Sequence, residues 1–226
     1  MQYQIYIDID SKGLQKIYSA GQFVTLVKSG ISDVMARDHN NSETQHVVWI
    51  AFQPLETNLV SWIENYYLYA TTTVLRFGNT ITMNSVTDVP VQTGWIYTFE
   101  QGHFKSNAGS GDTFNAENQM NEFFSFGLAQ QATVNNISTI APLNAVTVLF
   151  NEEAIFSPQE QISIFLSSCN NGSLINQVPG NALTVALTSQ QPVATVGFND
   201  VQDTFYLISG GSMPPSDFAR RVRRIR

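Results

Sequence analysis

Apolar and polar residues alternate along most of the chain, which is the pattern of strands with one buried face. Ile5, Ile7 and Ile9 near the N-terminus are separated by polar or amphipathic residues. Further runs rich in β-branched and aromatic residues are Gln22–Val27, His46–Phe52, Tyr66–Thr72, Thr80–Met83, Trp95–Phe99, Phe123–Ala129, Ala145–Phe150, Gln161–Leu166, Leu183–Leu187, Ala194–Phe198 and Thr204–Ile208. Turn-forming residues separate these runs, Ser11–Gly13 among them. The pattern predicts about a dozen short strands.

Short connections and the lack of a strand–helix alternation predict an all-β fold, an antiparallel β-sandwich spanning residues 1–213. The polar stretch 105–121 is expected to be a long loop or linker that divides the body into halves 1–104 and 122–208. Val47–Ala70 and Ala145–Ser168 each contain a strand ending in Phe, an acidic connection with a proline, and a second strand. Two similar β-units are one interpretation. The other is the general similarity of hydrophobic hairpins.

Helix signals are few and concentrate at the C-terminus. Short helical turns are conceivable at Ser61–Asn65 or Asn118–Phe124. In the tail 214–226, Pro215 and Ser216 form a helix-start signal, and three apolar residues then recur at helical spacing. The tail is expected to bind a polyanion, to dock as an amphipathic helix on its own or a neighbouring copy, or to stay solvated. Its contact residues would be Phe218, Arg220, Arg221, Val222, Arg223, Arg224 and Ile225.

Charge is sparse and unevenly distributed. Charged residues make up 13% of the chain, and the formal net charge is -7. The residues before Arg220 include 6 basic and 18 acidic side chains, a net charge of −12. This body should repel nucleic acid and anionic membranes, so that nucleic acid is an unlikely partner except through the tail.

The single cysteine, Cys169, excludes an intrachain disulfide. The first residues show neither the basic nor the apolar region of a signal peptide, and no apolar run approaches the roughly 18 residues of a transmembrane helix. These features predict a cytoplasmic protein without a transmembrane segment.

The motifs that mark common enzyme classes are missing from the sequence, including the nucleophile elbow, the phosphate-binding loop and the HExxH zinc motif. One acidic loop gathers potential metal ligands, but their spacing matches no metal motif, so a solvated loop is the favoured interpretation. Its residues are Asp33, Asp38, His39, Glu43 and His46. We therefore expect no enzyme activity, no metal and no cofactor.

Aromatic residues are dense around residues 62–69, where four rings fall within eight residues. Exposed Trp and Tyr beside amides are typical of sugar sites, where rings stack on the sugar and amides bind its hydroxyls. We expect Trp62, Asn65, Tyr66 and Trp95 to be the ligand-binding residues. Core packing between two sheets is the competing explanation, and a membrane interface is another.

The chain is poor in Lys and rich in Asn, Gln and Thr. In this composition it resembles cytoplasmic β-sandwich lectins and toxins, and also coat and particle proteins, although no motif supports either likeness. The leading prediction is a lectin-like, non-catalytic protein that recognises glycans or glycan-bearing surfaces. The alternatives are a self-assembling coat or inclusion protein that uses its tail as a connector between copies, and a β-sandwich pore-forming toxin.

Overall fold

The computed structural model describes residues 1–35 and 45–212, in which two β-sheets and one helix, α1 (Ser11–Ser19), are found. The larger sheet has ten strands in this part of the chain: β1 (Gln2–Asp8), β3 (Gln45–Val47), β5 (Thr57–Thr71), β6 (Ser85–Val86), β10 (Phe124–Val134), β11 (Ile137–Pro142), β12 (Asn144–Val148), β14 (Leu174–Ile175), β16 (Val193–Asn199) and β17 (Thr204–Gly210). The smaller sheet has seven there: β2 (Phe23–Met35), β4 (Ile50–Phe52), β7 (Trp95–Glu100), β8 (His103–Ala108), β9 (Phe114–Asn118), β13 (Glu153–Ser167) and β15 (Leu183–Ala186).

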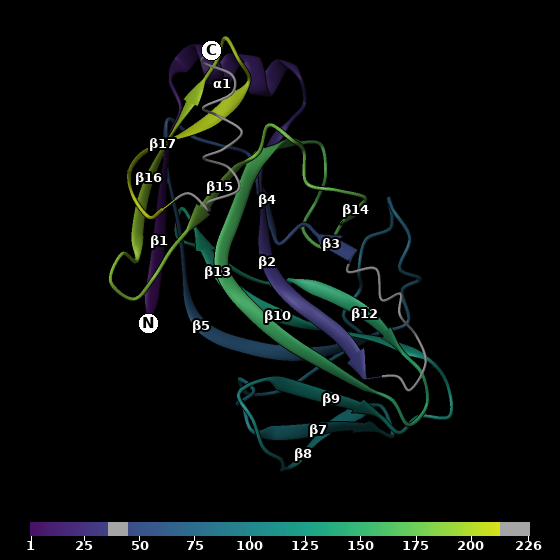
Figure 1. The fold of residues 1–226 in the computed structure, drawn as a ribbon. Coiled ribbons are helices and arrows are strands. Elements are labelled where there is room, and N and C mark those ends of the chain that lie inside the picture. The colour runs from purple at the N-terminus through teal and green to yellow at the C-terminus, as the bar shows by residue number, and fades with distance from the viewer. Residues whose placement is uncertain (36–44, 213–226) are drawn as a thin grey trace.

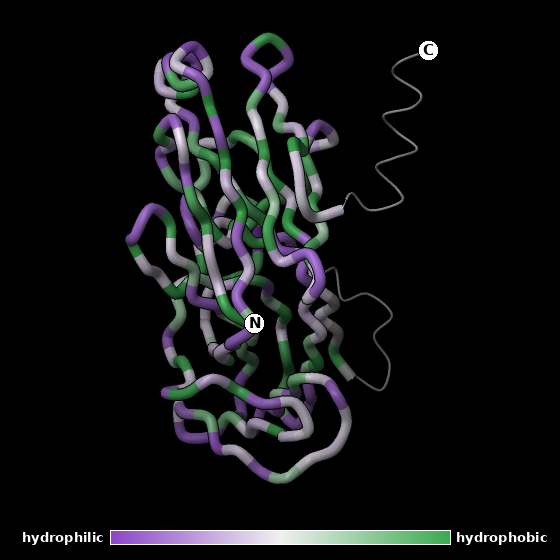
Figure 2. Tube along the Cα trace, turned by 90° about the vertical axis from the view of Figure 1, so that its left-hand side faces the viewer, coloured by the Kyte–Doolittle hydropathy of each residue, from purple (hydrophilic) through white to green (hydrophobic). Residues whose placement is uncertain are grey.

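The two sheets pack face to face, with the long strands β2 and β13 of one lying across β5 and β10 of the other (Figure 1). The core between them is rich in aromatic and branched residues, as a sandwich requires. Polar and apolar stretches alternate along the strands (Figure 2). In β1, Tyr3, Ile5 and Ile7 are buried and the residues between them are more exposed, as the period of two predicts.

The predicted all-β, sandwich-like fold is confirmed, with one refinement. Most neighbouring strands run antiparallel, but β1 pairs in parallel with β16, and β7 pairs in parallel with β9. Each sheet draws strands from both halves of the chain: β5 pairs with β10, and β2 pairs with β13. The two halves therefore build both sheets together.

The helix α1 replaces the turn expected at Ser11–Gly13. Asp10 caps it, because its side chain accepts a hydrogen bond of 2.7 Å from the backbone N–H of Gly13. Gly13 and Ile17, one helical turn apart, are its buried residues. A Cβ atom at Gly13 would come within 2.9 Å of both Ile9 and Phe198, so the helix packs closely only because this residue has no side chain.

The polar stretch 105–121 is not simply a linker, because it contains most of β8 and all of β9. In β9, Phe114, Ala116 and Asn118 alternate toward the core. Asn118 is fully buried and its amide donates to two backbone carbonyls, which compensates for removing a polar side chain from water.

Three further local expectations are corrected. Ser61–Asn65 lies inside β5 and Asn118–Phe124 contains no helix. Thr80–Met83 forms no strand, and only an isolated bridge joins Thr80 to Ser173. His46–Phe52 is two strands, because Val47 pairs in the larger sheet while Ile50 pairs in the smaller one. The chain crosses between the sheets at Val48 and Trp49, both fully buried.

None of the helices in residues 1–35 and 45–212 is long and apolar enough to cross a membrane. The tail 214–226, with its expected helix and all seven of its predicted contact residues, lies outside the described residues.

Candidate functional site

A buried ammonium group lies between the two sheets. Lys28 of β2 has a side chain that is only 1% exposed, and its Nζ atom lies 2.6 Å from Oε1 of Glu160 in β13. The same ammonium donates to Oε1 of Gln130 at 2.8 Å and to the hydroxyl of Tyr66 at 3.3 Å. A buried charge is tolerated only where it is paired and hydrogen-bonded, and here oxygen atoms from both sheets provide these contacts.

Three aromatic rings complete the surroundings of this ammonium. Its Nζ atom lies 5.6 Å from the ring centroids of Trp49 and Trp62 and 5.2 Å from that of Tyr66. These distances allow cation–π attraction, which is stronger in a site without water. Lys28, Trp49, Trp62, Tyr66, Gln130 and Glu160 together are called the Lys28 cluster below.

Glu160 reaches the cluster from an irregularity in β13. The pairing of β13 with β2 shifts between Pro158 and Ile162, and Gly30 of β2 lies opposite Pro158. A Cβ atom on Gly30 would lie 3.2 Å from the Cα atom of Pro158, so the two backbones approach closely here. Such bulges redirect side chains, and this one turns Glu160 toward the space between the sheets.

The carboxylate of Glu160 accepts hydrogen bonds from three side chains. Oε1 accepts from Lys28 and, at 2.7 Å, from the hydroxyl of Tyr66, while Oε2 accepts from Nε1 of Trp62 at 2.7 Å. Burial lowers the pKa of Lys28 to about 8, although Glu160 counteracts part of this effect. Burial and the neighbouring Glu160 raise the pKa of Tyr66 above its ordinary value.

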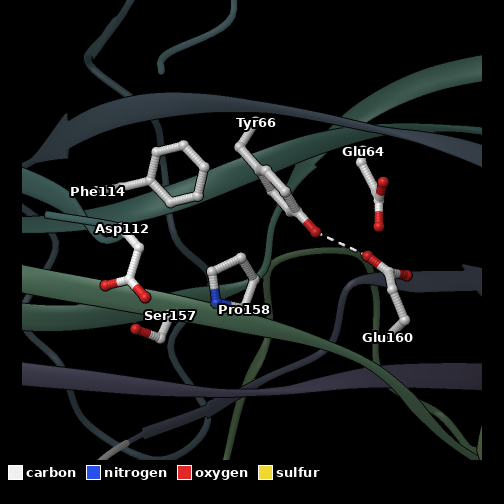
Figure 3. A pocket seen from close by; sticks show the side chains of 7 residues that line it. All are labelled: Glu64, Tyr66, Asp112, Phe114, Ser157, Pro158 and Glu160. Atoms are coloured by element: carbon white, nitrogen blue, oxygen red, sulfur yellow. Dashed lines mark hydrogen bonds between the residues drawn. The ribbon is translucent and has the colours of Figure 1, made fainter. Parts of the chain in front are cut away.

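A surface pocket begins where the Lys28 cluster ends, and Tyr66 and Glu160 belong to both. The pocket has a volume of about 410 Å³, within the range of roughly 300–1,000 Å³ typical of small-molecule sites. Its lining residues, called the acidic pocket below, are Glu64, Tyr66, Asp112, Phe114, Ser157, Pro158 and Glu160. Figure 3 shows Glu64 and Glu160 at one end and Asp112 beside Ser157 at the other.

Two aromatic rings line the acidic pocket side by side (Figure 3). The centroids of Tyr66 and Phe114 lie 5.4 Å apart at an interplanar angle of 58°. Only 6% of Tyr66 and 9% of Phe114 is exposed, so both rings hold fixed positions and present little surface to a ligand. Phe114 comes from β9, and Tyr66 follows an irregularity where β5 pairs with β10.

The side chain of Glu64 is held in place by Tyr3 of β1. The hydroxyl of Tyr3 donates to Oε1 of Glu64 at 2.7 Å, and the ring of Tyr3 stacks on Trp62 with centroids 5.8 Å apart. Burial and this carboxylate raise the pKa of Tyr3. The acidic pocket therefore rests on β1, β5, β9 and β13, with strands of both sheets fixing its walls.

The structure brings together two of the four predicted ligand-binding residues. Trp62 and Tyr66 meet at Glu160, but Trp62 is only 3% exposed, so its ring is not available for stacking on a sugar. Asn65 is exposed on β5 and Trp95 is 40% exposed on β7, and neither lines the acidic pocket. Of the four, Tyr66 is the one that lines this pocket.

Sequence analysis missed most residues of the Lys28 cluster and the acidic pocket, among them Lys28, Glu64, Asp112, Phe114 and Glu160. Lys28 follows the apolar run around Leu26 and Val27, and a lone lysine there is a weak signal of a buried partner. Its partner, Glu160, is 132 positions away and carries no local signal.

In residues 1–35 and 45–212, no three His, Cys, Asp or Glu side chains come together to hold a metal ion. Of the possible metal ligands in the acidic loop, Asp38, His39 and Glu43 lie outside the described residues.

The fold and the site define a β-sandwich-like protein with an ion pair buried between its sheets and an acidic pocket beside it. Comparisons with protein-family models, with curated proteins and with solved structures found no match.

Proposed function

We propose that this protein is a non-catalytic binding protein that recognises glycans through the acidic pocket. The observation that carries the proposal is one open pocket of about 410 Å³ lined by three carboxylates, one serine hydroxyl and two aromatic rings. Sugars carry many hydroxyl donors on a partly apolar ring, and a pocket of this composition offers acceptors and apolar contacts together.

The carboxylates divide their roles according to the hydrogen bonds they already make. Glu160 accepts from three side chains within the protein, so it serves mainly to fix Tyr66. Glu64 accepts one hydrogen bond from Tyr3, and Asp112 is exposed, so these two have acceptor capacity for ligand hydroxyls. Because Tyr66 and Phe114 are already immobilised, a ligand loses little affinity to ordering them.

The hydrogen bonds that Glu160 already accepts within the protein also favour binding over catalysis. A general acid or base must exchange a proton with the substrate, but this carboxylate is 11% exposed and is surrounded by donors, among them the Lys28 ammonium. Its geometry supports a structural role.

The test is a glycan array followed by titration of the best oligosaccharide against matched variants. Asp112→Asn and Glu64→Gln each remove a charge from the pocket but keep an acceptor oxygen. They should weaken binding about five-fold or more, since a hydrogen bond to a charged acceptor is stronger than one to a neutral acceptor by about 1 kcal/mol or more. Asp88→Asn, another exposed carboxylate, is the control and should bind like the original chain. Trp95→Ala and Asn65→Ala separate the acidic pocket from the contacts predicted by sequence. An array without hits, or unchanged affinity in both pocket variants, would exclude this site as a glycan site.

A further inference from the structure

Two groups that can react with each other meet inside the Lys28 cluster. The Nζ atom of Lys28 lies 2.8 Å from Oε1 of Gln130. A C=O bond is about 1.2 Å long, so the carboxamide carbon of Gln130 lies no more than about 4 Å from this nitrogen. Gln130 is fully buried and Lys28 is 5% exposed, so bulk water is kept away from both. An amine and a carboxamide held this close have a very high effective concentration for each other.

Gln130 is held in one orientation within the core. It lies on the inward face of β10 between Leu128 and Ala132, which are buried apolar residues. Its Nε2 atom donates to the backbone carbonyl of Ile63 at 2.7 Å, which leaves Oε1 facing the amine of Lys28. The carbonyl end of a fixed carboxamide is therefore presented to a fixed nucleophile.

The two groups come from different sheets, Lys28 from β2 and Gln130 from β10, and are 102 positions apart in the sequence. We propose that the Lys28 cluster is a self-modification site, at which Nζ of Lys28 displaces the side-chain nitrogen of Gln130 and joins the two sheets by an amide bond. The bond between Nζ and Cδ forms, the bond between Cδ and Nε2 breaks, and ammonia leaves. Carbon and nitrogen keep their oxidation states, so no oxidant, reductant or further reactant is needed.

Glu160 moves the proton that this exchange requires. Its Oε1 atom lies 2.6 Å from Nζ of Lys28 and accepts a hydrogen bond from the hydroxyl of Tyr66 at 2.7 Å. The carboxylate takes a proton from the attacking nitrogen, and the hydroxyl of Tyr66, 3.3 Å from Nζ, relays a proton to the departing nitrogen of Gln130. Ammonia escapes through the acidic pocket, which Tyr66 and Glu160 line. The step occurs once within the chain and turns over no outside substrate.

The attacking group must be the neutral amine. Burial lowers the pKa of Lys28 to about 8, although Glu160 and Glu64 counteract part of this effect. Burial raises the pKa of Tyr66 and lowers that of His46, which lines a small pocket beside Lys28, so neither changes its charge between pH 7 and pH 9. The neutral fraction of Lys28 then rises from about one-tenth at pH 7 to about nine-tenths at pH 9, so linking should be roughly ten-fold faster at pH 9.

The experiment follows the intact mass of the folded chain during incubation at pH 7 and at pH 9. Linking makes the chain about 17 Da lighter, by one ammonia, and digestion should give two peptides joined through residues 28 and 130. The joined peptides are decisive, because cyclisation of an asparagine elsewhere in the chain releases the same mass. The mass also separates linked from unlinked chains. Any dependence of stability on the charge of Lys28 belongs to the unlinked form, because an amide nitrogen does not titrate in this range.

Variants of the reacting groups should stop the mass loss. Lys28→Met and Gln130→Met each remove one of the two groups and should give no joined peptides. Glu160→Gln keeps both groups without the proton carrier and should link about a hundred-fold more slowly. Gln131→Met changes the exposed neighbour of Gln130 and is the matched control, which should link like the original chain. Circular dichroism spectra confirm that each variant is folded.

The original chain alone is enough to refute the inference. A folded chain that keeps its full mass at pH 9 and gives no joined peptides would overturn it. Joined peptides that form equally fast in denaturing urea would overturn it too, because unfolding removes the geometry on which the step depends. The step uses no ligand, so a glycan array without hits leaves this result unaffected.

Discussion

Removal of the amine from the Lys28 cluster should destabilise the fold. In Lys28→Met, a side chain of similar length replaces the amine, which leaves Glu160 and Gln130 without the hydrogen bonds that Lys28 donates. A buried acceptor left without a donor typically costs about 1–3 kcal/mol. Trp62 and Tyr66 still donate to Glu160, so we expect a loss of about 2 kcal/mol. A deprotonated Lys28 would still donate both hydrogen bonds, so this loss differs from the effect of pH on the same residue.

The matching double variant distinguishes lost pairing from lost packing. In Lys28→Met with Glu160→Gln, no charge remains in the cluster, and the glutamine can still accept one hydrogen bond. Since replacing both members of a buried pair is often close to neutral, the double variant should be more stable than Lys28→Met alone. Lys105→Met is the control, because Lys105 and Glu100 form an ion pair at the surface, and its loss should change stability little.

The same cluster predicts how stability depends on pH. Burial lowers the pKa of Lys28 to about 8, below that of the unfolded chain, so the unfolded state binds more protons between pH 8 and pH 10. Stability should therefore rise with pH across this interval, by roughly 2–3 kcal/mol from this group. Above pH 10 the trend reverses, because burial raises the pKa of Tyr66 and Tyr69, and their unfolded-state phenols lose protons first.

The assay is urea unfolding followed by tryptophan fluorescence, repeated at one-unit steps from pH 7 to pH 10. Trp49 and Trp62 lie in the cluster and report its disruption directly. The original chain should gain stability up to pH 10, while Lys28→Met should lose this gain. If Lys28→Met costs less than about 1 kcal/mol, or keeps the full gain, then the ammonium is not buried as the structure indicates.

Two further predictions concern the helix α1. Gly13→Ala should lower the free energy of unfolding by about 1–3 kcal/mol and with it the unfolding temperature, because the new Cβ atom meets Ile9 and Phe198 at 2.9 Å. Gly180→Ala, whose Cβ atom has nothing within 4 Å, should leave the unfolding temperature unchanged. Asp10→Ala removes the helix cap and should cost about 1 kcal/mol in the same thermal measurement, while Asp10→Asn should restore most of it. Equal unfolding temperatures for Gly13→Ala and Gly180→Ala, or for Asp10→Ala and Asp10→Asn, would contradict these assignments.

The alternation of apolar and polar residues along the sequence predicts only those strands whose inward residues are all large and apolar. β1 is the clear case, since Ile5 and Ile7 give it an unmistakable period of two. β9 could not be predicted in the same way, because its inward residues are Phe114, a small alanine and a buried asparagine. The asparagine is accommodated by the backbone carbonyls of Glu122, four residues further on, and of Val148 in β12, and the local sequence contains no sign of the second.

The helix α1 escaped prediction for a related reason. Its buried face consists of Gly13 and Ile17, and glycine next to serine and lysine is the usual composition of a turn. The contact that makes glycine necessary is with Phe198, which lies far along the chain. Tertiary packing therefore decides a segment whose local preference is ambiguous.

For the site, sequence analysis found the aromatic residues but not their exposure. The density of rings at Trp62 and Tyr66 marks them correctly as unusual, yet Trp62 faces the core and donates to Glu160. The bulge at Pro158 that turns this carboxylate inward depends on its close approach to Gly30 in another strand. A single sequence contains the bulge residues and the aromatic residues, but not the pairing that brings them together.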